Sequence, residues 1–119
     1  MDTAVLGRFG EEQAARYLRR RGYKVLERNY RCRSGEIDLI VSKGEYVVFV
    51  EVKLRKNADF ASAREFVTRA KQQRVITAAS LWLGEHACER PVRFDVVEVY
   101  APHGPLGHVE INHLEDAFS

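Results

Sequence analysis

Hydrophobic and polar positions change their spacing several times along the chain, and each change predicts a new element. Residues 4–21 carry apolar residues at helical spacing, with Gly7, Ala14 and Leu18 on one stripe. The stretch GEIDLIV alternates apolar and polar residues, which is typical of a strand. The predicted elements are a helix over 4–21, strands over 23–30, 35–41 and 47–53, a helix over 68–83, a strand over 91–100 and a short extra strand over 108–114. This order predicts an α/β fold with a mixed central sheet flanked by helices.

The length and composition indicate one folded domain. The chain has 119 residues, of which 45% are hydrophobic and 30% are charged, as in ordinary globular proteins. Repeats, low-complexity tracts and linkers are not evident in the sequence. We therefore expect a single domain over 1–119.

The stretch VVFVEVKLRK, residues 47–56, places two opposite charges in an otherwise apolar strand. Because side chains alternate along a strand, Glu51 and Lys53 share one face with Phe49. The other face carries only valines, and we expect it to be the packing face: Val48, Val50 and Val52. The charged face needs a partner.

The preceding strand supplies that partner if Lys43 and Gly44 form a two-residue hairpin turn. Glu36 then lies opposite Glu51, and Asp38 lies diagonal to Glu51 on the same face. Three carboxylates and one amine would share a small patch, which is costly unless a cation binds there. Mg²⁺ prefers oxygen ligands and commonly uses one or two carboxylates.

A simpler interpretation is that Lys53 neutralises Glu51 as an exposed ion pair, which would contribute little to stability. The matching positions of Asp38 and Glu36 weigh against it. Glu11 also weighs against it, because it falls on the apolar stripe of the first helix, where a carboxylate requires a partner.

The net charge of +2 conceals an uneven distribution. Residues 1–34 hold nine Lys and Arg against four Asp and Glu, and residues 53–74 hold seven against two. Residues 35–52, which contain the acidic patch, hold one against four. This arrangement suits a polyanion held over a cation site, although solvated faces that balance by chance are an alternative.

Four basic residues are candidates for binding phosphates. Arg69 and Lys71 fall in the first turn of the second helix, with Thr68 as its N-cap, where backbone amides attract anions. Arg55 and Lys56 directly follow the charged strand. Such contacts would give affinity without reading sequence. Tolerated surface residues are an equally simple interpretation of Arg69 and Lys71.

Three segments together resemble a known family: GRFGEEQAARYLRRRGYKVLERNYRCRSGEIDLI, VFVEVKLR and RFDVVEV. The resemblance, which covers about residues 7–100, is to the YraN-like proteins, a family of small bacterial proteins. Their core is similar to the restriction-endonuclease-like superfamily, in which an Asp and a later Glu-x-Lys form a nuclease site. A branch of that superfamily resolves Holliday junctions.

The resemblance implies a role for each matching residue. Asp38 and Glu51 would be catalytic, metal-binding acids, with the carbonyl of Val52 as a third oxygen ligand. Lys53 would position the attacking water. Glu11 matches an additional acid of the junction-resolving branch, and Glu36 is a less general metal-ligand candidate. The implied cofactor is Mg²⁺ or Mn²⁺.

The sequence therefore predicts a metal-dependent endonuclease-like protein acting on DNA, which is favoured over RNA, including branched or otherwise structured DNA. One alternative is a nucleic-acid-binding module that keeps the nuclease fold without turnover, and another is a protein-interaction scaffold. A homodimer is an open alternative, because the related junction-resolving enzymes are dimers.

The remaining chemistry-bearing residues are expected to be structural. Cys32 and Cys88 lack the spacing of a metal site and suggest free thiols. The sequence also has no apolar run long enough for a membrane span. Together with the two free thiols, this leads us to expect a cytoplasmic protein. The histidines of the C-terminal region lack zinc-motif spacing and are expected at the surface: His103, His108 and His113. Trp82 and Phe94 are expected in the core.

Overall fold

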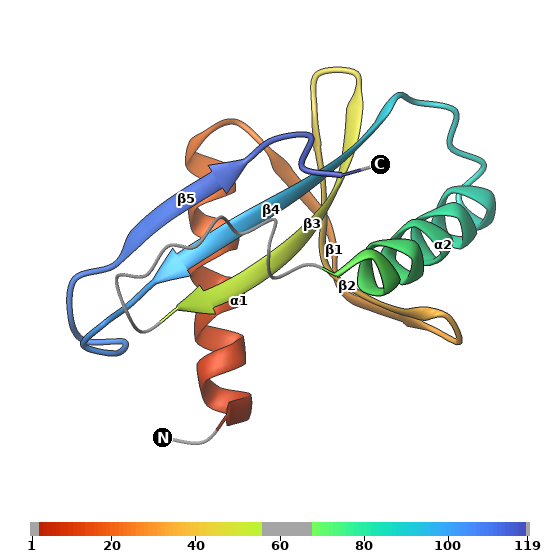
Figure 1. Cartoon of the computed structure of the whole chain (residues 1–119). Coiled ribbons are helices and arrows are strands. Elements are labelled where there is room, and N and C mark those ends of the chain that lie inside the picture. Colours follow the sequence, from red (N-terminus) through yellow and green to blue (C-terminus); the bar gives the residue numbers. More distant parts are fainter. Residues whose placement is uncertain (1–2, 56–67, 119) are drawn as a thin grey trace.

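The computed structural model describes residues 3–55 and 68–118 of the chain, and it has the predicted order of elements (Figure 1). In chain order these are α1 (Thr3–Arg20), β1 (Lys24–Cys32), β2 (Gly35–Lys43), β3 (Tyr46–Arg55), α2 (Arg69–Glu85), β4 (Val92–Tyr100) and β5 (Glu110–Leu114). The expected mixed α/β architecture is confirmed, including the short C-terminal strand. Thr68 is the N-cap of α2, as its position predicted.

The strands form one sheet in the order β1-β2-β3-β4-β5, so β3 lies in the middle. Neighbouring strands are antiparallel except β3 and β4, which run parallel. A parallel pair requires a crossover connection, and the chain between β3 and β4 contains α2. The sheet is therefore mixed, as predicted.

Each face of the sheet has its own apolar core. On the α1 side, Ala14 and Leu18 pack with Val48 and Val50 of β3. On the α2 side, Phe49 packs with helix residues that include Val75, Ala79 and Trp82. The expectation that only the valine face of β3 packs is therefore too narrow. A central strand of a sheet covered on both faces is apolar on both sides for much of its length.

The hairpin register differs from the predicted one. Lys43 pairs with Tyr46, so the two turn residues are Gly44 and Glu45 instead of Lys43 and Gly44. Gly44 has a φ of 58°, and a glycine at the first central position suits one of the two common hairpin turns. The shift moves Glu36 out of the position opposite Glu51, but it leaves Asp38 on the same face as Glu51.

Beyond Leu39–Val50, the last pair of the β2–β3 ladder, the two strands separate. The β1–β2 hairpin continues past the N-terminal end of α2, whereas β3 continues alongside β4 (Figure 1). The first residues past the last pair are Asp38 on β2 and Glu51 on β3. We call the place where β2 and β3 separate the fork.

A buried polar network closes the sheet on the side of β4 and β5. Asp95 is fully buried, and its carboxylate accepts two hydrogen bonds from Arg93, at 2.9 and 2.8 Å. The His113 Nε2 lies 2.7 Å from Asp95 Oδ2, and the Tyr17 hydroxyl of α1 lies 3.3 Å from His113 Nδ1. The prediction that His113 lies at the surface is wrong, because its side chain is only 7% exposed.

Other expectations about packing are confirmed. Trp82 is buried, Phe94 packs against the same core, and Cys32 and Cys88 are free thiols. In the two described parts of the chain, no helix has the length and apolar character needed to cross a membrane.

Candidate active site

Asp38 closes the fork by bonding to the backbone of β3. Its Oδ2 accepts a hydrogen bond of 2.7 Å from the backbone N–H of Val52. In a strand, the N–H and C=O of one residue point toward the same neighbouring strand. The Val52 carbonyl oxygen is therefore directed into the fork beside Asp38, which is where the sequence-based assignment needs it.

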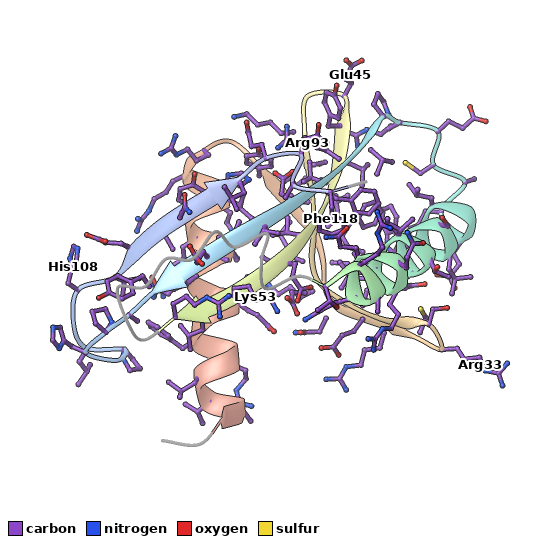
Figure 2. The ribbon with its side chains drawn as sticks, viewed as in Figure 1. Arg33, Glu45, Lys53, Arg93, His108 and Phe118 are labelled. Atoms are coloured by element: carbon purple, nitrogen blue, oxygen red, sulfur yellow. The ribbon has the colours of Figure 1, made fainter. Side chains whose placement is uncertain are left out.

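Glu51 is the point at which three elements meet. It is buried, with only 5% of its side chain exposed, and two ammonium groups lie on the same carboxylate oxygen, Oε1. Lys71 Nζ of α2 is 2.5 Å from this atom, and Lys53 Nζ of β3 is 3.5 Å from it. Figure 2 shows Lys53 on the sheet, near the first turn of α2. The site therefore joins β2, β3 and α2.

The N-cap of α2 sets the position of Lys71. The Thr68 hydroxyl oxygen accepts a hydrogen bond of 3.2 Å from the backbone N–H of Lys71. This contact satisfies an amide that the helix leaves without an internal partner and fixes the first turn. The lysine side chain then extends toward Glu51.

The negative charges of Asp38 and Glu51 repel each other. Burial and the negative charge of Glu51 raise the pKa of Asp38 from 3.8 to about 7, although the Val52 amide opposes the shift. The charge of Glu11 on α1 adds a smaller contribution in the same direction. Near neutral pH, the fork can therefore exchange a proton for another cation.

The two lysines differ in how firmly they hold their protons. Burial and the neighbouring Lys71 lower the pKa of Lys53, against the attraction of Glu51. Burial also works to lower the pKa of Lys71, but its hydrogen bonds with Glu51 and Lys53 and the negative charges of Glu51 and Asp38 together outweigh this, and the net shift is upward. One amine is thus disposed to lose a proton and the other to retain it.

The donor atoms at the fork suit a hard divalent cation. Two carboxylates and a backbone carbonyl are oxygen ligands of the kind that Mg²⁺ and Mn²⁺ accept, with water completing the shell. Over residues 3–55 and 68–118, no three His, Cys, Asp or Glu side chains gather into a metal-binding group. The donor set that fits is therefore Asp38, Glu51 and the Val52 carbonyl.

The two further acids that the resemblance suggests, Glu11 and Glu36, lie apart from this set. Glu36 is exposed and forms an ion pair of 3.1 Å with Arg31 on the neighbouring strand β1. Glu11 is half-buried on α1 and borders a hollow that Glu36 also borders. Both acids therefore flank the fork on the side of the β1–β2 hairpin.

The predicted phosphate-binding residues have different surroundings. Arg69 is exposed at the start of α2. Arg55 is mostly buried, and its Nε lies 3.3 Å from Oε2 of Glu98, a fully buried acid of β4. Lys71 contacts Glu51, and Lys56 lies outside the described residues. Among the described positions, Arg69 is exposed and the Lys71 side chain is 40% exposed, whereas Arg55 is mostly buried.

The sequence did not predict the contact of Lys71 with Glu51. It also did not predict that Glu98 is a buried acid in contact with Arg55. Glu98 pairs with Lys53 across the parallel strands β3 and β4, and its Oε1 accepts a 3.4 Å hydrogen bond from Asn112. A carboxylate among the valines of RFDVVEV was an available signal of a buried acid. The Lys71 contact had no local signal, because it depends on how α2 packs.

Comparisons with known proteins agree with the resemblance in the sequence. Residues 10–99 match the uncharacterised protein family UPF0102. The chain belongs to this family. A UPF0102 protein of Frankia alni is 48% identical over 115 residues, covering 96% of this chain and 94% of the relative.

Relatives in other bacteria carry the same family name. A UPF0102 protein of Rhodococcus opacus is 45% identical over 115 residues, covering 96% of both chains. One from Clostridium perfringens is 42% identical over 114 residues, covering 95% of this chain and 93% of the relative. The YraN-like resemblance is thereby confirmed. The names of these relatives state no activity.

Proposed function

We propose that this UPF0102 protein is a metal-dependent endonuclease that acts on DNA, including branched or otherwise structured DNA. The observation that carries the proposal is the fork, where Asp38 and Glu51 stand beside the Val52 peptide and Lys53. Carboxylates, a carbonyl and an amine in one partly buried place are the groups that hydrolysis of a phosphodiester requires.

The protein groups would divide the work. Asp38, Glu51 and the Val52 carbonyl would hold Mg²⁺ or Mn²⁺. The bound cation would supply positive charge for the phosphate and acidify a water molecule. Lys53, with its lowered pKa, would orient the attacking water and accept its proton.

Lys71 would keep its charge and stabilise the negative charge that develops on the phosphate in the transition state. Its position at Glu51 Oε1 places that charge at the edge of the donor set. Lys71 was predicted as a phosphate-binding residue, and this role retains that assignment inside the site.

The test is cleavage of linear duplex, single-stranded and four-way junction DNA with Mg²⁺ or Mn²⁺. Asp38→Asn and Lys53→Ala should each lower the cleavage rate by about 100-fold or more. The matched controls are Glu45→Gln and Lys43→Ala, which alter exposed residues at the turn end of the β2–β3 hairpin. If the wild type and the Asp38→Asn variant cut every substrate equally, the proposal fails.

One observation favours a second candidate, a DNA-binding module without turnover. Lys53 and Lys71 already place two positive charges on Glu51, which can satisfy this acid without a metal. The two candidates differ in response to Mn²⁺, which should raise the melting temperature of the endonuclease by mass action and have little effect on Asp38→Asn. Equal shifts in both proteins, with salt-sensitive DNA binding and no cleavage, would favour the module.

A further inference from the structure

The turn end of the β1–β2 hairpin is hollowed on both sides of Glu36. One hollow, of about 360 Å³, is bordered by Arg8 and Glu11 of α1 and by Arg31 of β1. The other, of about 290 Å³, is bordered by Lys71 and Arg74 of α2. Glu36 borders both, so the hollow on the α1 side and the hollow on the α2 side meet at this residue. We call them together the hairpin track.

Positive charge exceeds negative charge along the hairpin track. The basic residues that border it are Arg8, Arg31, Lys71 and Arg74, against the acids Glu11 and Glu36. Arg33 stands beyond them at the tip of the hairpin and points away from the sheet (Figure 2). Because Lys71 contacts Glu51, the track leads directly into the fork. A polyanion lying in the track would pass beside the proposed scissile position.

Backbone features keep the hairpin track in place. Gly35, at the start of β2, has a φ of 149°, and a Cβ at this position would lie 3.4 Å from the Cβ of Arg74. The hairpin and α2 therefore approach each other closely at the second hollow. Asn29, which borders the first hollow, has a φ of 52° within strand β1. Such a value is uncommon inside a strand, and strained backbone of this kind gathers at functional sites.

The ion pair between Arg31 and Glu36 can rearrange. Both side chains are exposed, at 77% and 53%, so the pair is weakly held. A phosphate group beside Arg31 would compete with Glu36 for the guanidinium. Glu36 would then weaken the binding of DNA phosphates, and it would not act as a metal ligand.

We infer that the hairpin track seats the sugar-phosphate backbone of the DNA on one side of the scissile bond, with Arg31 and Arg74 as its phosphate contacts. This inference rests on the proposed function, and it adds the surface that holds the substrate. The contacts are to phosphates, so they contribute affinity and position without sequence preference.

The first experiment measures binding of junction and linear duplex DNA by fluorescence anisotropy in EDTA, over a range of salt concentrations. A double variant, Arg31→Gln with Arg74→Gln, should weaken binding by about tenfold or more near 0.1 M salt. It should also lower the slope of log K against log salt by about two, because each lost phosphate contact removes about 0.9. The control, Arg19→Gln with Arg20→Gln, makes the same charge change at the exposed end of α1.

The second experiment uses Glu36→Gln, which should bind DNA several-fold more tightly than wild type and show the same Mn²⁺-induced shift in melting temperature. A smaller Mn²⁺ shift together with weaker DNA binding would instead make Glu36 a metal ligand and overturn its role in the track. Because this variant predicts a gain, loss of folding cannot imitate the result.

The outcomes separate the two proposals. If the wild type cleaves DNA while both double variants bind it equally well, the hairpin track is wrong and the endonuclease stands. If the wild type neither binds nor cleaves DNA at low salt, both proposals fall. If cleavage is absent but the double variant loses affinity and slope as stated, the track holds and the endonuclease does not.

Discussion

At the scale of single residues, the ionisation of Asp38 links the stability of the protein to pH. Burial and Glu51 raise its pKa from 3.8 to about 7, so the folded state keeps a proton that the unfolded state releases. The stabilisation from this proton is fully present below about pH 4 and is lost as the pH rises through 7. Metal-free protein should therefore lose stability across this range.

Asp38→Asn should remove this dependence, because the amide oxygen can still accept the Val52 hydrogen bond but carries no charge. In EDTA, the variant should gain stability relative to wild type as the pH rises, by roughly 2–3 kcal/mol between pH 5 and pH 8. Urea unfolding at both pH values measures this difference. Glu36→Gln, which removes an exposed carboxylate, should show almost no such change, and a similar change there would contradict the explanation.

At the scale of elements, the first turn of α2 connects helix stability to the site. Thr68→Ala removes the hydroxyl that caps the Lys71 amide and should lower the free energy of unfolding by about 1 kcal/mol. It should also lower cleavage, because Lys71 is no longer held at Glu51. Denaturant unfolding and a cleavage assay measure the two effects.

Two variants in the same helix serve as controls for this prediction. Thr68→Ser keeps the capping hydroxyl and should behave like wild type. Thr77→Ala removes a hydroxyl in mid-helix that bonds back to the Gln73 carbonyl at 2.9 Å, and it should change stability little. If Thr77→Ala and Thr68→Ala lowered cleavage equally, the position of Lys71 would not depend on the cap.

The elements also show what the sequence can predict. Alternation in GEIDLIV and the N-cap at Thr68 are local signals, and they located β2 and the start of α2. The hairpin register was misjudged because one glycine can occupy either central position of a two-residue turn. Asp38 nevertheless remained on the face of Glu51, since the error preserved alternation.

Long-range packing is what local patterns leave open. Lys71 meets Glu51 only because α2 packs over β3, twenty residues away in sequence. His113 looked like a surface residue in a short polar strand, but it is buried against Asp95. The separation of β2 from β3, which leaves room for the site, likewise follows from the twist and pairing of the whole sheet.

At the scale of the whole molecule, Asp95 ties together α1, β4 and the C-terminal residues. Its carboxylate accepts hydrogen bonds from Arg93, from His113 and from the backbone amide of Asp116. Burial alone would raise the pKa of Asp95, but the contacts with His113 and Arg93 outweigh it and lower the pKa below 3.8. The charged form is therefore the one that the fold stabilises.

Asp95→Asn should lower the free energy of unfolding by about 2–4 kcal/mol, because Arg93 loses its buried counter-charge. The advantage of the wild type should be present above about pH 4 and should shrink as the pH falls through the lowered pKa of Asp95. Guanidinium unfolding at several pH values measures it. Glu115→Gln removes a more exposed partner of Arg93, 3.4 Å away, and a loss as large as that of Asp95→Asn would show that burial is not the cause.

The parallel pairing of β3 with β4 also orders events during synthesis. β1, β2 and β3 are complete at Arg55, whereas β4 begins only at Val92. During synthesis, one edge of the apolar strand β3 therefore stays unpaired until β4 has been translated. Asp38 and Glu51 meet when a local hairpin closes, while Lys71 must await a helix translated later. The chain thus brings Asp38, Glu51 and Lys53 together first, and the arrival of Lys71 coincides with the covering of the sheet on the α2 side.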